Sequence, residues 1–69
     1  MWVVKSGFGR KQAKVWGSFE SREEILSFAE KEICPGNWEQ FSEGENYIEW
    51  KSEKNRDAWV VAFRIKIFS

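Results

Sequence analysis

Histidine is absent from this 69-residue chain, and cysteine, proline and methionine occur once each. Without histidine, the chain lacks the side chain that most often serves as a general base near neutral pH or as a metal ligand. One cysteine, Cys34, can form neither an internal disulfide nor a cysteine-based metal site, so we expect a reducing compartment. These scarcities exclude the small folds that depend on disulfides or zinc.

Long apolar segments are missing as well. No run approaches the roughly 18 apolar residues that indicate a membrane-spanning helix. The sequence also does not begin with a charged segment followed by an apolar one, the pattern of a secretory leader. We therefore expect no membrane partner and a cytoplasmic location, in the host cytoplasm if the protein is viral.

Enzymatic chemistry is not predicted. Cys34 follows a predicted helix, whose negative end disfavours the thiolate that a nucleophile needs, so a small apolar filler is the better interpretation. The many glutamates lie in polar stretches, and no pair is isolated in an apolar pocket as acid–base catalysis requires. We expect a protein without catalytic residues, cofactor or metal.

Aromatic side chains are abundant, with five Trp, six Phe and one Tyr. A chain of this size buries only about 60% of the surface that its unfolded form exposes, and large aromatic side chains compensate for the small core. We expect one folded domain over residues 1–69.

The net charge is zero, but the charges are segregated along the sequence. Residues 1–19 carry a net charge of +4, residues 20–49 carry −7 and residues 50–69 carry +3. The molecule is therefore predicted to be acidic on one side and basic on another.

The first 19 residues predict a β-hairpin, because "MWVVKS" and "QAKVWGSF" flank the turn "GFGRK". A phosphate loop would need its glycines between a strand and a helix start, whereas these lie between two strands. The turn still forms a basic loop tip, at which Arg10 and Lys11 either contact phosphates or an acidic partner or are only solvated. The expected inward residues are Trp2, Val4, Ala13, Val15 and Phe19, and the expected outward residues are Lys14 and Trp16.

A helix is predicted in "SREEILSFAEKEICPG", and Cys34 is biased away from helix because it precedes Pro35. Ser21 and Glu24 form a capping box, and Pro35 with Gly36 ends the helix. Its apolar stripe consists of Ile25, Leu26, Ala29 and Ile33, with Phe28 at the edge.

Two or three further strands are predicted after the helix, one of them short and near Trp38 to Phe41. In "YIEWK", Ile48 and Trp50 are expected to face inward, and Tyr47, Glu49 and Lys51 outward. In the last strand, Trp59, Val61, Phe63, Ile65 and Ile67 alternate as one apolar row, which we expect to pack under the helix. The predicted fold is α+β, an antiparallel sheet of four to five strands with one helix on one face, in the order β-β-α-β-β-β.

The second row of the last strand begins apolar, with Ala58, Val60 and Ala62, and ends basic, with Arg64 and Lys66. Because this long strand is expected to be central, the row predicts an uncovered sheet face that is aromatic and basic. Trp16 is the candidate exposed anchor there, although it could instead fold over Val60 or Ala62. The residues expected around it are Lys5, Lys14, Tyr47, Lys51, Arg64 and Lys66.

The layout resembles that of small phage-encoded α+β anti-CRISPR proteins, which inhibit type I surveillance complexes. The resemblance is carried by "WVVK", the helix "SREEILSFAEKEICPG" and "YIEWKSEKNRDAW", which together span most of the chain. It implies a non-enzymatic protein that occupies a host nucleoprotein, with contacts at the basic turn of Lys51, Lys54 and Arg56 and at an aromatic sheet. This chain differs in its longer apolar last strand and greater tryptophan content.

Two functions follow as hypotheses. The first is a small non-catalytic binding protein of phage or mobile-element type that inhibits a host protein or nucleoprotein complex. The alternative is a nucleic-acid-binding module that uses the same basic aromatic face. A homo-oligomer that buries Val60 and Ala62 between two sheets is a third possibility. The predicted contact residues are Arg10, Lys11, Lys14, Trp16, Lys51, Lys54, Arg56, Arg64 and Lys66.

Overall fold

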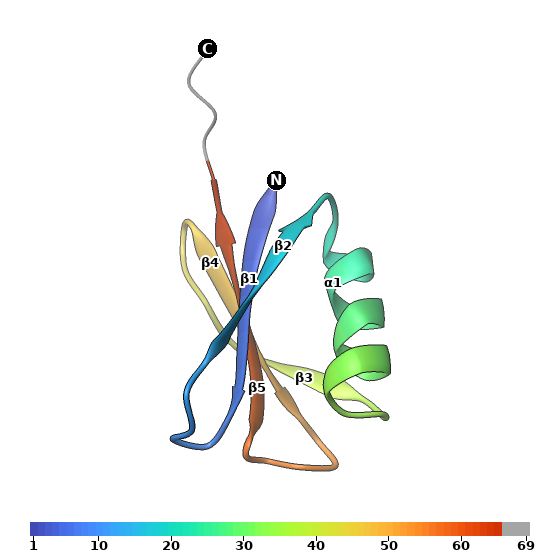
Figure 1. The fold of residues 1–69 in the computed structure, drawn as a ribbon. Helices are drawn as coiled ribbons and strands as arrows, with labels where there is room; N and C mark the ends of the chain where they lie inside the picture. The colour runs from blue at the N-terminus through green and yellow to red at the C-terminus, as the bar shows by residue number, and fades with distance from the viewer. Residues whose placement is uncertain (66–69) are drawn as a thin grey trace.

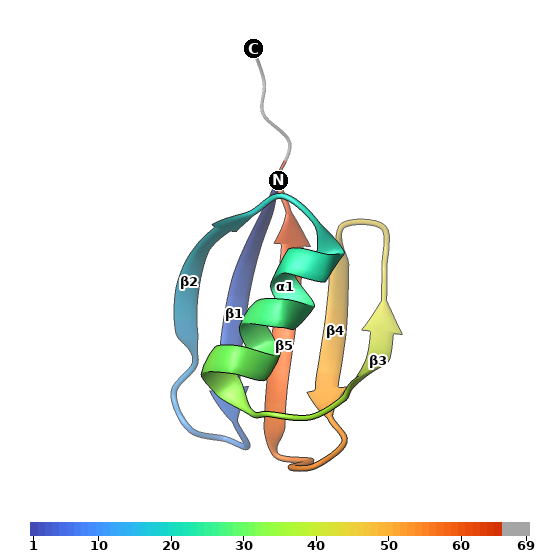
Figure 2. The same ribbon diagram turned by 90° about the vertical axis from the view of Figure 1, so that its right-hand side faces the viewer.

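The computed structural model describes residues 1–65 and contains one five-stranded antiparallel sheet with a helix across one face (Figures 1 and 2). Its strand order is β2-β1-β5-β4-β3, so β5 is central, as predicted. The α+β class and the order β-β-α-β-β-β are confirmed. The elements are β1 (Trp2–Phe8), β2 (Lys14–Phe19), α1 (Arg22–Phe28), the π-helical turn η1 (Ala29–Ile33), β3 (Trp38–Glu43), β4 (Tyr47–Ser52) and β5 (Ala58–Arg64).

The helix begins and ends where the sequence predicts. The Ser21 hydroxyl accepts a hydrogen bond from the backbone N–H of Glu24, and the Glu24 carboxylate accepts one from the N–H of Glu20, both at 3.2 Å. At the other end, the N–H of Cys34 donates to the carbonyl of Ala29, five residues earlier, at 3.0 Å. This wider final turn is η1, which directly follows α1 and ends the helix before Pro35.

The core lies between the helix and the sheet face that it covers. Trp2, Val4, Ile48 and Trp50 point into it, as predicted, and the helix contributes two fully buried residues. The core residues are Trp2, Val4, Ile25, Ala29, Ile48, Trp50, Val60 and Ala62.

The predicted orientation of the last strand is wrong. Ala58, Val60 and Ala62 are fully buried on the covered face, so Trp59 and Phe63 lie on the opposite face. The two β5 residues in the core under the helix, Val60 and Ala62, are small, whereas the predicted row has bulky side chains. Ile65 follows β5 and is exposed, and Ile67 lies outside the described residues.

Trp59 packs instead on the neighbouring strand β1. A Cβ atom at Gly7 would lie 2.6 Å from Cζ2 of Trp59, so the indole sits directly over the glycine. The Trp59 Nε1–H also donates to the carbonyl of Gly9 at 3.2 Å. A glycine in β1 therefore provides the place for an aromatic ring on the uncovered face.

A bulge in β2 reverses the predicted faces of the residues that precede Gly17 in that strand. Between the pairs Val3–Ser18 and Lys5–Val15, β2 has two residues where β1 has one. A one-residue offset exchanges the faces of the residues on its two sides. The prediction is thus wrong for Val15, which is 62% exposed on the uncovered face, and right for Phe19, which packs against the core.

Because of the same bulge, the predicted outward positions of Lys14 and Trp16 are wrong. Lys14 pairs with the buried Ser6, and Trp16 packs against the core, so both lie on the covered side. The uncovered side of the sheet is called the open face below. Its residues are Val3, Lys5, Gly7, Val15, Ser18, Glu39, Phe41, Ser42, Tyr47, Glu49, Lys51, Trp59, Val61 and Phe63.

The turn between β1 and β2 and the turn between β4 and β5 lie at the same end of the sheet (Figure 2). The N–H of Gly9 donates to the carbonyl of Asp57 at 2.7 Å and ties the two turns together. Gly9 has a φ of 58°, which a side chain would disfavour. Two segments distant in sequence thus form one end of the molecule.

Candidate partner-binding site

A cleft with a volume of about 340 Å³ lies between the β1–β2 hairpin and the end of the helix. Phe8, Trp16 and Ile33 contribute apolar surface to its lining. Lys11 and Lys14 contribute two cations, and we therefore call it the basic cleft. The remaining lining residues are Ser6, Gly7, Gln12 and Glu32.

Trp16 is held in the basic cleft by three contacts. Its Nε1–H donates to the hydroxyl of the buried Ser6 at 2.7 Å, and its ring meets Phe28 edge-on at 4.7 Å between centroids. The Lys14 ammonium lies 4.3 Å from the centre of the indole. Such a cation–π contact keeps a positive charge beside an aromatic surface, a combination that suits recognition of an anionic group next to an apolar one.

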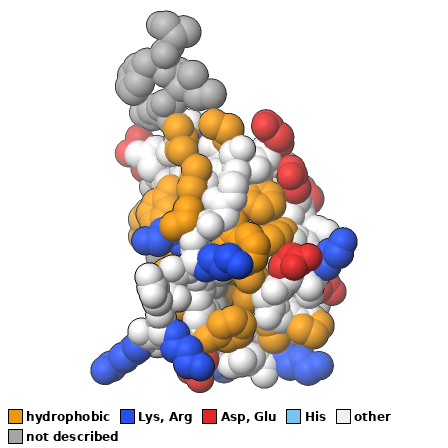
Figure 3. Space-filling view, viewed as in Figure 1, with side chains coloured by type: hydrophobic (Ala, Val, Ile, Leu, Met, Phe, Trp, Pro, Cys, Tyr) orange, Lys and Arg blue, Asp and Glu red, His pale blue; other side chains and the backbone are white. Residues whose placement is uncertain are grey.

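The end of the molecule next to the basic cleft carries four predicted contact residues, Arg10, Lys11, Lys54 and Arg56, and we call it the basic end. Arg56 donates to the Glu39 carboxylate at 3.2 Å. Within residues 1–65, neither Arg10, Lys11 nor Lys54 forms a salt bridge. Figure 3 shows lysine and arginine side chains at this end, and most of the visible acidic side chains on the side of α1.

The other predicted contact residues are not part of this site. Lys51 lies on the open face, as predicted, with its ammonium 4.1 Å from the centre of the Phe41 ring. Arg64 was predicted on the uncovered face and instead stacks over Trp2 on the covered side, at 4.8 Å. Lys66 lies outside the described residues. A single basic aromatic face is therefore not formed, because its predicted members divide between the two sides of the sheet.

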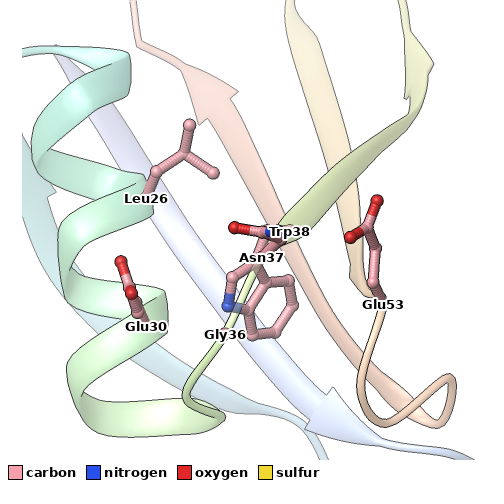
Figure 4. A pocket seen from close by; sticks show the side chains of 6 residues that line it. All are labelled: Leu26, Glu30, Gly36, Asn37, Trp38 and Glu53. Atoms are coloured by element: carbon pink, nitrogen blue, oxygen red, sulfur yellow. The ribbon is translucent and has the colours of Figure 1, made fainter.

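A second cleft, of about 410 Å³, opens between the helix and the start of β3 (Figure 4). Glu30 and Glu53 line it together with Leu26 and Trp38. The Trp38 Nε1–H already donates to the carbonyl of Cys34 at 3.1 Å. Its two carboxylates distinguish this cleft from the basic one, and none of its lining residues within the described part of the chain is a lysine or arginine.

Sequence reasoning missed Phe8, Gln12, Glu32 and Ile33 as residues of the candidate site. Phe8 continues the row of Trp2, Val4 and Ser6. Alternation alone could therefore have placed Phe8 on the covered side of the sheet. Its 41% exposure arises because it lies at the end of β1, near the turn, and that position requires the three-dimensional fold.

Within the described residues, no helix is long and apolar enough to cross a membrane, and no group of three or more potential metal ligands is found. The buried Cys34 accepts a hydrogen bond from the Ser52 hydroxyl at 3.4 Å. The chain matches no protein-family model, no curated protein and no solved structure with which it was compared.

Proposed function

We propose that this protein is a non-catalytic binding domain that inhibits a host protein or nucleoprotein complex through the basic cleft and the basic end. The single observation that supports this proposal is the arrangement of Trp16 and Phe8 beside Lys11 and Lys14 in one open cleft. Tryptophan beside cations is typical of the residues that dominate protein interfaces. The mode of action is the one that the anti-CRISPR resemblance implies, occupation of a host complex without chemistry.

The geometry favours a protein contact over a nucleic acid in this cleft. Glu32 lines the cleft opposite the hairpin. A phosphate backbone in the cleft would lie near this carboxylate, whereas a protein can place an apolar side chain on Trp16 and direct a carboxylate away from the helix toward Lys14. The expected contact surface on the partner is an apolar side chain flanked by acidic residues.

The alternative function, nucleic-acid binding, is supported by the basic end, where Arg10, Lys11 and Lys54 form no salt bridge within residues 1–65. The same turn that carries Lys54 also carries Glu53 and Asp57, which interrupt a positive path. Titration of DNA and RNA with the protein at increasing salt separates the two functions. Sub-micromolar affinity that falls steeply with salt would support the alternative and contradict the protein-binding proposal.

The test of the proposed site compares Lys14→Glu with Arg64→Glu. Both residues are exposed, both are at a strand end on the covered side, and each places its cation over a tryptophan. Each substitution should therefore have a similar small effect on stability, about 0.5–1 kcal/mol. Only Lys14 lines the basic cleft.

The measurement is quantitative co-purification of host proteins with the wild-type chain and with each variant. We expect Lys14→Glu to weaken capture of the specific partner about tenfold or more and Arg64→Glu to leave it unchanged. Equal loss with both variants, or no loss with Lys14→Glu, would contradict the assignment of the cleft. Thermal melting of both variants checks that they remain folded.

A further inference from the structure

The open face exposes several large apolar side chains although it belongs to a very small domain. Val15 is 62% exposed, Phe41 59%, Phe63 43% and Tyr47 39%. Phe63 and Tyr47 are paired neighbours on adjacent strands, whereas Val15 and Phe41 lie on the two edge strands. Exposed apolar surface of this kind marks an interaction site. This face lies on the other side of the sheet from the helix and from Trp16, so it requires an explanation separate from the proposed function.

The strand register places the residues of the open face in three rows across the sheet. In the middle row, Val61 of β5 has Lys5 of β1 on one side and Glu49 of β4 on the other. The backbones of Lys5 and Glu49 lie about 10 Å apart, at two strand spacings, and the two side chains form no salt bridge with each other within residues 1–65. In the next row, Phe63 has Val3 on one side and Tyr47 on the other.

We infer that the open face binds the open face of a second copy of this chain, about a twofold axis that runs parallel to β5 between the two Val61 side chains. This axis exchanges the two sides of β5, so Lys5 of one copy meets Glu49 of the second copy, and the same pair forms a second time. Val3 likewise meets Tyr47 of the second copy, and Phe63 meets its own counterpart. Charge and apolar surface are both complementary in this one arrangement.

The other simple alignment is disfavoured by charge. A twofold axis in the same plane but perpendicular to β5 would leave each residue on its own side of the sheet. Lys5 would then face Lys5 of the second copy, and Glu49 would face Glu49. Like charges placed opposite each other in an interface cost free energy, so the axis parallel to β5 is selected.

The size of the open face suits a small dimer. Five strands about 4.8 Å apart, and seven residues that rise about 3.3 Å each, give a plane of roughly 550 Å². The relief of the side chains raises the accessible area above this value, toward the roughly 600–1,000 Å² per partner of specific interfaces. Two twisted sheets pack face to face with their strands within about 30° of each other, which the axis parallel to β5 allows.

The experiment is a charge exchange between Lys5 and Glu49, measured by sedimentation velocity over a concentration series. The wild-type chain should dimerise. Lys5→Glu and Glu49→Lys should each weaken their own homodimer about tenfold or more, because each creates two like-charged pairs. An equimolar mixture of the two variants should form a heterodimer, because every such pair then joins a lysine to a glutamate.

Lys31→Glu, which changes an exposed lysine on the helix, is the matched control and should dimerise like the wild type. Circular dichroism melting verifies that each variant is folded. A wild-type chain that is monomeric at every concentration would overturn the inference, as would a mixture in which the two variants fail to associate. Neither outcome bears on the basic cleft, because the inference does not depend on the proposed function.

Discussion

Trp16 is the residue on which the candidate site depends most. Its indole is fixed by a hydrogen bond to Ser6, an edge contact with Phe28 and the ammonium of Lys14. A side chain that is already ordered loses little further rotamer freedom on binding, so the surface of the basic cleft is preorganised. The sequence indicated Trp16 as an anchor beside Lys14 but could not show that the ring is half-buried and supported from below.

Trp16→Phe tests this support, since it keeps an aromatic ring but removes the Nε1–H donor to the buried Ser6 hydroxyl. We expect a loss of about 1 kcal/mol in the free energy of unfolding, measured by urea denaturation. In a double-mutant cycle with Ser6→Ala, the two substitutions should show a coupling energy of about 0.5–1.5 kcal/mol. Strict additivity would show that the hydrogen bond contributes nothing to folding.

Among the elements, β5 determines how the two sides of the sheet differ. Its buried row consists of Ala58, Val60 and Ala62, and two of these lie in the core under the helix. Its other row carries the bulkier Trp59, Val61 and Phe63 on the open face. One face of this central strand therefore packs in the core under the helix, and its other face forms the middle of the proposed dimer interface.

A comparison of Val60→Ala with Phe63→Ala tests the two faces of β5. Val60 is fully buried, so its truncation should cost about 2 kcal/mol of unfolding free energy. Phe63 is 43% exposed, and its truncation should cost less than about 1 kcal/mol, although phenylalanine is the larger side chain. The measurement is made in the Lys5→Glu background, where the chain is expected to be monomeric. If Phe63→Ala lowered the free energy of unfolding more than Val60→Ala, the result would support the orientation of β5 that the sequence pattern predicts.

Much of the fold could be predicted because its signals are local. The cap at Ser21, the stop at Pro35 and the alternation of Trp2 with Val4 each require only neighbouring residues. The orientation of β5 could not be predicted, because both of its rows are apolar. The choice between them depends on how closely Ala29 of the helix approaches the sheet, and that distance is a property of the whole fold.

The candidate site could be predicted in composition but not in placement. Arg10, Lys11, Lys14 and Trp16 are all predicted contact residues, and three of them line the basic cleft. The predicted side of Lys14 and Trp16 is reversed by one bulge in β2, where Trp16 and Gly17 oppose a single residue of β1. Alternation alone cannot detect an inserted residue, because the pattern before and after it remains regular.

For the whole molecule, the segregated charge of the sequence becomes a spatial separation. Most of the visible acidic side chains lie on the side of the helix, and the basic end lies where two turns meet (Figure 3). The open face exposes Val15, Phe41, Tyr47 and Phe63. The axis proposed for the dimer preserves the direction of the strands, so both basic ends would lie at the same end of the pair. A dimer of this kind would carry its two basic clefts on opposite outer sides, because each cleft lies on the covered side of its own sheet.

Photo-crosslinking from two matched positions separates the occupant of the basic cleft from the occupant of the open face. Phe8 in the basic cleft is 41% exposed and Phe63 on the open face is 43% exposed, so a benzoylphenylalanine at either position replaces a similar side chain. In host lysate, we predict that the probe at Phe8 crosslinks to a host protein and that the probe at Phe63 crosslinks to a second copy of the chain. The same adducts from both positions, or no host protein from Phe8, would contradict the account.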